Sequence, residues 1–359
     1  MAETIHFGEE FRKALSEYYS LKSVTEGAYN NALNAEFNGS DMVYVYEVAT
    51  SPVNNYNKKQ DPSTGSRFGT PTEVGDYRYA FKLTQDISFD RTVDRGNNDA
   101  QFFIKKAGAI MKAYTDKEIR PFKEKYRLKK WCTEAGIHTA LAAAPGKSTI
   151  AEQIIDLHTA MIEEGVPDDS GTLFIPRAYL KVLKLSTEWV ELDSLGGKSI
   201  PNGKIKMFDG LVVKPVPTRF FPDDCYFAIF AKDSIIAPEK INLMRGIKDS
   251  ENMDGDRFQF RGKFDAFVLP SLCAGAAVAC KKDSVTPTPS VSISSGKATV
   301  TDSSSGVVYY TLDGSDPRYA SAEAKVYSTA VTVAPGDIFR CCAKADGKYM
   351  SAATKDVIT

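Results

Sequence analysis

The hydrophobic pattern of this chain changes character near Asp283. Before it, apolar residues recur both at helical spacing and in alternating, strand-like runs, which predicts a mixed α+β protein. After it, short runs rich in Val, Ser and Thr are separated by Gly, Asp and Ser turns, which predicts a small β-sandwich. Residues 283–290 contain two prolines that restrict their own φ and keep the preceding residue extended, so we expect a stiff linker between two folding units.

Strand-like runs flank an unusually long polar tract. Residues 42–48 and 76–84 have strand character, whereas residues 51–75 are polar and rich in Pro and Gly. Such a tract is rare inside a compact domain. It is either a surface loop or an extended hairpin that reaches a neighbouring subunit. The strong flanking strands favour the hairpin, so we expect residues 41–94 to form an extended loop with its strands.

Residues 95–137 are predicted to form one long helix, because apolar residues continue at helical spacing. Pro121 would clash with the carbonyl four residues earlier, which predicts a kink or a restart near residues 115–120. A capping box at residues 115–118 supports a restart. The basic run at residues 123–130 is expected to be a solvated face near the helix end.

Residues 138–236 alternate between helical and strand-like patterns, which indicates a compact α/β subdomain. A second helix is predicted over residues 149–165, opened by a capping box and closed by Gly165. Paired strands are expected in residues 237–282. Residues 1–40 are polar and acidic apart from one amphipathic stretch, so we expect an N-terminal arm with little core of its own.

The charge balance excludes several classes of protein. The 359 residues include 45 Lys and Arg and 46 Asp and Glu, for a net charge of −1. Residues 283–359 hold 7 basic and 8 acidic residues, which leaves 38 of each before the linker. Neither part has the basic excess of a protein that grips DNA. No apolar run is long enough to cross a membrane and the N-terminus lacks the features of a secretory signal, so a cytoplasmic origin is expected.

Candidate catalytic chemistry is sparse. The six Cys show no metal-ligand spacing and are expected to be reduced structural thiols. Cys341 and Cys342 are adjacent in a strand pattern, so one should face the core and the other solvent. The three histidines (6, 138 and 158) lie outside any catalytic motif. Acidic pairs at 163–164, 168–169 and 223–224 stand at element ends, where solvated or capping carboxylates are expected. We therefore predict no cofactor, no metal and no enzymatic activity.

The order of the elements carries a resemblance. An acidic arm, a long polar hairpin, a long helix after residues 86–94 and an α/β subdomain are followed by paired strands at residues 255–268. This order resembles the major capsid proteins of tailed bacteriophages, which have the Johnson fold, over roughly residues 40–282. Residues 164–175 are also similar to the axial subdomain of that family. The resemblance implies five regions: an N-terminal arm (1–40), an extended loop (41–94), a spine helix of the peripheral domain (95–137), an axial domain (138–236) and peripheral-domain strands (237–282).

The resemblance also implies a function. Such subunits self-assemble as hexamers and pentamers into an icosahedral shell, which encloses double-stranded DNA without reading its sequence. Portal, scaffold and decoration proteins are further expected partners, and the location is the virion capsid after assembly in the host bacterial cytoplasm. Some members crosslink a loop Lys to an Asn of a neighbour, but the acceptor and the catalytic Glu are not identifiable here, so crosslinking is not predicted. Inter-subunit contacts are expected in the extended loop, at Asn54, Asn55, Lys58, Lys59, Arg67 and Phe68.

The C-terminal unit resembles a second family. The string Tyr-Tyr-Thr-Leu-Asp-Gly-Ser-Asp-Pro at residues 309–317 is similar to the immunoglobulin-like domain of chitobiase-type carbohydrate enzymes. Residues 291–359 are expected to form an outer domain that decorates the shell or binds surface glycans. Its tyrosines suit strand packing as well as sugar stacking. Candidate glycan contacts are Tyr310, Asp313, Asp316 and Tyr319.

Two alternatives to a capsid protein stay open at this point. One is a nanocompartment shell of the same fold, which would enclose a cargo enzyme in place of DNA. The other is a glycan-binding protein, for which the C-terminal unit would be the functional part.

Overall fold

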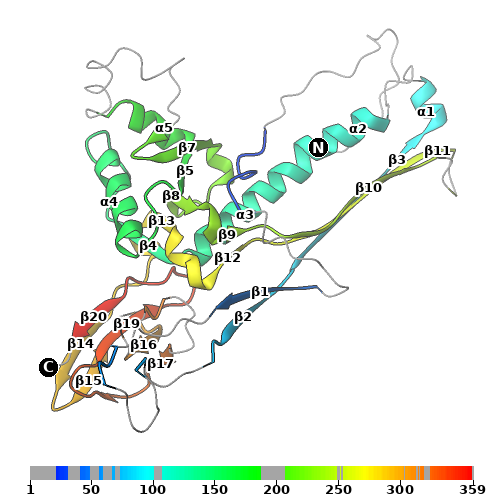
Figure 1. Cartoon of the computed structure of the whole chain (residues 1–359). Coiled ribbons are helices and arrows are strands. Elements are labelled where there is room, and N and C mark those ends of the chain that lie inside the picture. The colour runs from blue at the N-terminus through cyan, green and yellow to red at the C-terminus, as the bar shows by residue number, and fades with distance from the viewer. Residues whose placement is uncertain are drawn as a thin grey trace.

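The computed structural model shows a mixed α and β molecule built around several separate sheets (Figure 1). This composition of helices and strands confirms the predicted α+β class. The structure describes residues 22–30, 41–48, 56–59, 67–68, 73–100, 107–186, 207–248, 251, 254–302, 304–312, 314, 316–318 and 324–357.

A six-stranded mixed sheet forms the largest unit of the molecule, which we call the six-stranded unit. Helices α4 (Ile150–Glu163) and α5 (Arg177–Lys184) pack on one face, and α3 (Arg120–Glu134) packs on the other. Strands β4 and β13 pair in parallel, as do β5 and β7, whereas β8 runs antiparallel to both of its neighbours. In spatial order the strands are β4 (Ile137–Leu141), β13 (Ala276–Lys281), β8 (Cys225–Ala231), β5 (Gly171–Pro176), β7 (Leu211–Val216) and β6 (Met207–Phe208).

Two apolar cores lie on the two faces of this sheet. Because successive side chains of a strand point to opposite faces, β8 contributes Phe227 and Ile229 to one core and Ala228 and Phe230 to the other. All seven residues of β8 are buried. This explains why β8 reads in the sequence as a continuous apolar run without polar alternation.

The long helix is interrupted where the sequence predicts a break. Helices α1 (Arg95–Ala100) and α2 (Ala107–Tyr114) precede a π-helical turn at Thr115–Ile119, and α3 follows directly. Pro121 has no N–H to donate, and the wider π-helical turn removes the need for a regular hydrogen bond there. The predicted capping box is wrong, because the Thr115 hydroxyl donates to the carbonyl of Met111 at 2.9 Å.

A long antiparallel sheet extends away from the six-stranded unit beside α2, as Figure 1 shows. It consists of β10 (Glu239–Ile247), β11 (Gly255–Phe264) and β3 (Gln85–Asp94). A separate hairpin pairs β1 (Met42–Val48) with β2 (Asp76–Lys82), which confirms strands on both sides of the polar tract. Short strands β9 (Ile235–Ile236) and β12 (Phe267–Val268) pair between these parts.

The C-terminal module, as we call residues 290–357, consists of two antiparallel sheets around a small core that includes Ala298, Val308 and Phe339. Residues 325–326 and 331–332 form two short strands that belong to different sheets. One sheet has β14 (Ser290–Ser294), β15 (Lys297–Thr301) and β18 (Val331–Thr332). The other has β17 (Lys325–Val326), β16 (Val307–Thr311), β19 (Ile338–Lys344) and β20 (Thr354–Val357). Single-turn 3-10 helices occur at Thr218–Phe220, Lys232–Ser234 and Lys282–Ser284, and a longer one at Pro270–Gly275.

The ends of α4 differ in how well the sequence predicts them. Gly165 has φ +88° and its N–H bonds the carbonyl of Ile162, which confirms the glycine cap. The capping box at the start of the helix is wrong, since the Thr149 hydroxyl accepts from the N–H of Gly146 at 3.0 Å. His138 lies in β4.

Candidate functional site

The β1–β2 hairpin has one buried and one exposed face. On the inner face Val43 is fully buried and Phe81 stacks near Phe267, with ring centroids 4.8 Å apart. On the outer face Tyr46 and Val48 are 64% and 65% exposed. A two-stranded hairpin is marginal alone, and an exposed apolar stripe of this kind marks an interaction surface.

The predicted inter-subunit contacts lie in the polar tract beyond this hairpin. The N–H of Asn57 donates to the carbonyl of Arg67 at 2.9 Å, so the two described pieces of the tract run side by side. The rings of Tyr56 and Phe68 meet edge to face at 5.0 Å, and Phe68 is 77% exposed. Lys58 and Lys59 are exposed as well. The contact role of these residues stays a prediction, and Asn54 and Asn55 lie outside the described residues.

One side of the long sheet carries cross-strand ion pairs. Arg257 and Arg261 of β11 bind Asp90 and Asp86 of β3. The Arg257 guanidinium, which hydrogen-bonds Asp90, lowers the pKa of that carboxyl to about 2. These groups are solvent-exposed, so we assign them to strand register and solubility rather than to catalysis.

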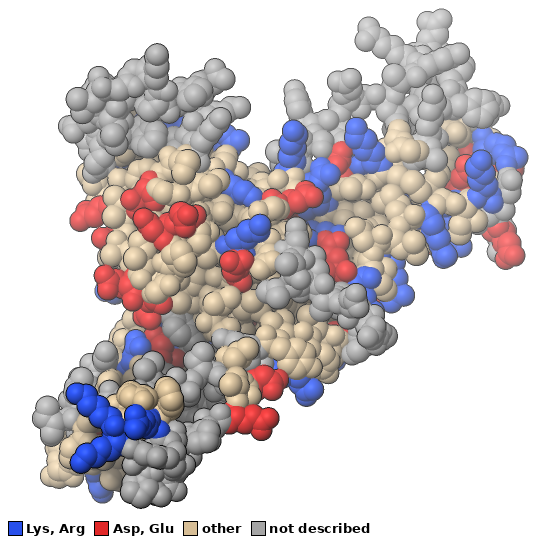
Figure 2. Space-filling model, viewed as in Figure 1, with Lys and Arg blue, Asp and Glu red and all other residues tan. Residues whose placement is uncertain are grey.

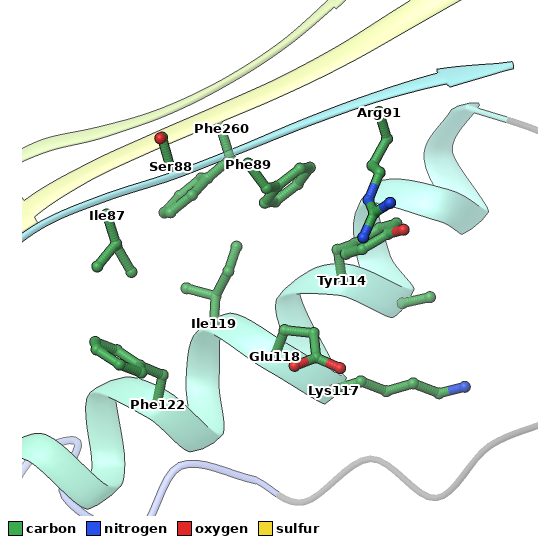
Figure 3. A pocket seen from close by; sticks show the side chains of 11 residues that line it. Ile87, Ser88, Phe89, Arg91, Tyr114, Lys117, Glu118, Ile119, Phe122 and Phe260 are labelled. Atoms are coloured by element: carbon green, nitrogen blue, oxygen red, sulfur yellow. The ribbon is translucent and has the colours of Figure 1, made fainter. Parts of the chain in front are cut away.

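The other side of the long sheet forms an apolar cleft with the long helix (Figure 3). The cleft has a volume of about 700 Å³. Phe89 stacks between Tyr114, at 4.8 Å, and Phe260, at 5.6 Å. Lys117 and Glu118 are the neighbouring charged groups of the helix. Figure 3 shows aromatic and aliphatic side chains pointing into the space, an arrangement that suits an apolar side chain rather than a reaction.

A buried carboxylate fixes the first described segment of the chain. Glu124 of α3 is 2% exposed and accepts hydrogen bonds from the N–H of Val24, at 3.1 Å, and of Thr25, at 3.0 Å. Within the arm, residues 22–30 therefore pack onto the rest of the chain, and Ala28 belongs to the main apolar core.

The basic run of α3 is also only partly solvated, which corrects the sequence-based expectation. Lys123 and Arg127 are buried and both bind Glu239 of β10, at 3.0 and 2.6 Å. These ion pairs fasten the long sheet to the long helix. The sequence gives no local signal for them, because Glu239 lies more than 100 residues away.

The histidines do not form a catalytic arrangement. His138 is buried, and its Nε2 lies 2.8 Å from the carbonyl of Cys132. Burial lowers its pKa from the ordinary value, so the ring is neutral. His158 contacts Asp209 through Nδ1 at 2.9 Å and Asp168 through Nε2 at 3.5 Å. No nucleophile from the described part of the chain joins either ring, and His6 lies outside it.

All six cysteines are reduced and buried. One of Cys341 and Cys342 was predicted to face the core and the other solvent, and this is wrong, because both are fully buried. Burial raises the pKa of Cys342, as it does that of Cys273, to about 12. Buried thiols of this kind are unreactive. The described residues include no group of three or more His, Cys, Asp or Glu placed to share a metal ion.

Described residues of the C-terminal module contact the six-stranded unit at two places. Tyr349 stacks on His138, with ring centroids 4.8 Å apart and planes 10° apart. The Cys225 thiol lies 3.5 Å from the Tyr349 hydroxyl. At the second place Arg318 of the module binds Glu164, at the end of α4, at 3.0 Å.

Two of the candidate glycan-contact residues already have partners within the C-terminal module. Asp316 is 7% exposed and binds Arg318 and Arg340, which does not fit the glycan contact predicted for it. Tyr310 stacks on Phe339 at 5.6 Å in the core of the module, so strand packing accounts for it. Asp313 and Tyr319 lie outside the described residues.

Comparisons with known proteins agree with this architecture. A model of the family described as "Fn3 associated" matches residues 299–357. No curated protein matches the sequence. None of the helices in the described ranges combines the length and apolar character of a membrane-spanning segment.

Solved structures from phages share the fold. A structure from Mycobacterium phage Che8 is similar with a TM-score of 0.58 and 15% identity, covering 76% of this chain and 96% of that chain. The capsid structure of Cyanophage P-SCSP1u gives 0.58 and 10%, covering 77% and 93%. The mature capsid of bacteriophage PhiM1 gives 0.57 and 12%, covering 77% and 92%. The chain therefore has the Johnson fold of phage capsid structures, as the resemblance predicted, followed by an all-β module.

Proposed function

We propose that this chain is the major capsid protein of a tailed double-stranded DNA bacteriophage, assembled as hexamers and pentamers into an icosahedral shell. The observation that carries the proposal is the extent of the shared fold. It covers 76–77% of this chain and 92–96% of the three phage chains. Almost nothing of those chains is missing here, and the surplus in this chain corresponds in size to the C-terminal module.

The exposed apolar surfaces of the molecule support the proposal that it is a subunit of a larger assembly. The outer face of the β1–β2 hairpin exposes Tyr46 and Val48, and Phe68 stands exposed in the adjoining tract. The apolar cleft beside Phe89 and Phe260 is open on its outer side. A monomer rarely leaves several such surfaces uncovered, whereas a subunit in a lattice covers them with its neighbours.

The regions of the proposed subunit follow the sequence-based division. Residues 1–40 act as the arm, 41–94 as the extended loop, 95–137 as the spine helix, 138–236 as the axial domain and 237–282 as the peripheral strands, except that β13 of the last region lies in the six-stranded sheet. The arm and the extended loop reach neighbouring subunits, with Lys58, Lys59, Arg67 and Phe68 among the contacts. Because the net charge is −1, the shell encloses DNA without gripping it.

The role of the C-terminal module is decoration of the shell, either as reinforcement or as an adhesin for glycans. Its contacts through Tyr349 and Arg318 hold it against the six-stranded unit rather than leaving it on a free tether. The subunit has a structural and not an enzymatic role. Portal and scaffold proteins are the expected partners of assembly.

The test is the assembly state of the full recombinant chain, measured by sedimentation velocity with negative-stain imaging. We expect closed shells, or rings of five and six. Replacing residues 54–69 by a Gly-Ser segment of equal length should leave folded subunits that form no stable shells. Unchanged shells from that variant would contradict the role of the extended loop. Particles purified from producing cells separate the alternatives, since double-stranded DNA inside them indicates a virion and a cargo enzyme indicates a nanocompartment.

A further inference from the structure

Two helices on the same face of the six-stranded sheet carry opposite charge. Helix α4 contains three carboxylates, Glu152, Asp156 and Glu163, and no Lys or Arg. Helix α5 contains three basic residues, Arg177, Lys181 and Lys184, and no Asp or Glu. The side chains of helix α4 therefore contribute three negative charges, and those of helix α5 contribute three positive charges.

The two helices contact each other and cover different parts of the strand order. Helix α4 contacts β4 and β13, at one edge of the sheet, whereas α5 contacts β5 and β7, toward the other edge. Their apolar sides share one core, so their charged sides face outward. The six-stranded unit thus has an acidic flank, formed by α4, and a basic flank, formed by α5.

The outward face of α4 has no partner in the described part of the chain. Glu152, Asp156 and Glu163 are exposed, and none of them forms an ion pair with a described residue. Ile155 and Ile162 lie on the same side, 42% and 39% exposed. Figure 2 shows acidic side chains gathered on the face of the molecule over α4. Exposed isoleucines framed by carboxylates form a surface that a protein partner would cover.

The basic flank extends beyond α5 into a cleft of about 710 Å³. Among the described residues that line this cleft, Glu26 is the one acidic residue. Four lining residues are basic: Lys22, Arg177, Lys214 and Arg219. Lys214 donates to the carbonyl of Glu26 at 3.1 Å, and its burial lowers its pKa. Val212 and Leu185, each 47% exposed, add apolar area to this flank.

We propose that the acidic flank of one copy of this chain binds the basic flank of the next copy around the ring. This inference rests on the proposed function, because it assumes that copies assemble. A contact between two different surfaces, repeated about an axis, closes a ring. Opposite potentials steer the two flanks together and oppose the reversed orientation, in which like charges would meet.

DNA is the main rival partner for the basic flank. Phosphates would account for the lysines and arginines of the cleft, but they would leave the acidic flank and its two exposed isoleucines without a role. A second copy accounts for both flanks with one contact. We therefore commit to the second copy and let the experiment expose DNA binding.

Charge reversal provides the test. The acidic-flank variant carries Glu152→Lys and Asp156→Lys, and the basic-flank variant carries Arg177→Glu and Lys181→Glu. Each should fold like the unaltered chain by circular dichroism and thermal melting, yet form at least tenfold fewer rings and shells in sedimentation velocity. The chain with all four substitutions should regain assembly, since its flanks are again complementary.

A mixture of the two variants gives the sharpest outcome. One variant then has two basic flanks and the other two acidic flanks, so they can only alternate around a ring. An equimolar mixture should form six-membered rings, and five-membered rings should be absent because an odd ring cannot alternate. Added salt at 0.5 M should weaken these rings.

A matched control changes the same charge elsewhere. Lys297→Glu with Lys325→Glu shifts the net charge by −4, as the basic-flank variant does, but lies on the C-terminal module. It should assemble normally. Normal shells from the two flank variants, or no rings from their mixture, overturn the inference.

The outcomes separate the two proposals. An unaltered chain that stays monomeric at every concentration overturns the proposed function together with this inference. Unaltered shells combined with unaffected flank variants overturn the inference alone. If the basic-flank variant assembles normally but loses binding of a fluorescein-labelled DNA duplex, the flank binds DNA and the proposed contact is wrong.

Discussion

The six-stranded unit and the β1–β2 hairpin differ in how completely their apolar side chains are buried. Both faces of the six-stranded sheet are covered by helices of the same chain, and Trp131, Phe174 and Phe230 are fully buried there. The described residues cover one face of the hairpin, and Tyr46 and Val48 are largely exposed on the other. The comparison teaches that this chain supplies the stability of the first region by itself, whereas the second keeps an exposed apolar face, which a neighbouring subunit covers under the proposed function.

The largest effect on stability should come from Trp131 in the core of the six-stranded unit. Its ring packs against Phe230 at 5.9 Å and its indole N–H donates to the carbonyl of Ile236 at 3.2 Å. Trp131→Ala leaves a cavity and an unsatisfied carbonyl, which should lower the free energy of unfolding by about 3–5 kcal/mol. Urea denaturation of the subunit measures this loss. A loss below about 1 kcal/mol would contradict the full burial of Trp131 in the core of the six-stranded unit.

A smaller loss is expected where Glu124 of α3 holds the first described segment. Glu124→Ala removes the acceptor of the Val24 and Thr25 N–H groups and should cost about 2–3 kcal/mol. Amide hydrogen exchange at these two residues should accelerate more than exchange in β8. Glu124→Gln, which keeps one acceptor oxygen, is the control and should lose about half as much. Unchanged exchange in the alanine variant would contradict the anchoring role.

The contact of the C-terminal module should depend on pH through His138. Burial holds the pKa of His138 below its ordinary value of 6.5. The unfolded chain therefore takes up the proton first as the pH falls, so the stabilisation is complete above pH 6.5 and declines progressively below it. The Tyr349 stack should loosen in the same range.

Limited proteolysis of the linker at residues 283–290 reports on this contact. Cleavage should be faster at pH 5.5 than at pH 7.5. His138→Gln cannot take up the proton, so its cleavage rate should not change between these two values. Equal cleavage of the unaltered chain at both values would remove His138 from the docking contact.

Local patterns in the sequence predicted most elements of the six-stranded unit and of the helix that packs on it. Strands β7 and β8 follow from their apolar runs, Gly165 from helix-end chemistry, and the irregular turn before Pro121 from the missing N–H. Each of these features depends on neighbouring residues alone. The same reasoning overstated two capping boxes, because threonine hydroxyls found other local partners in the folded chain.

Features that depend on distant residues could not be predicted in this way. The pairing of Lys123 and Arg127 with Glu239 joins parts of the chain more than 100 residues apart. Cys342 is fully buried, although strand alternation predicts that either Cys342 or Cys341 faces solvent, so its burial depends on more than the local pattern. For the same reason Asp316 looked like a ligand-binding turn residue, although two arginines occupy it.

The smallest effect on the isolated subunit, and the sharpest test of the comparison, comes from two valines of nearly equal exposure. Val48 of the hairpin is 65% exposed and Val326 of the C-terminal module is 62% exposed. Replacing either by Ser should change the free energy of unfolding by less than about 0.5 kcal/mol, since neither is buried by its own chain. If a neighbour covers the hairpin, Val48→Ser also removes apolar burial from the assembled state, and the concentration needed for assembly should rise about tenfold. Val326→Ser should leave that concentration unchanged. Equal assembly by both variants would mean that exposure on the hairpin does not differ in kind from exposure on the module, and that the hairpin is not completed by a neighbour.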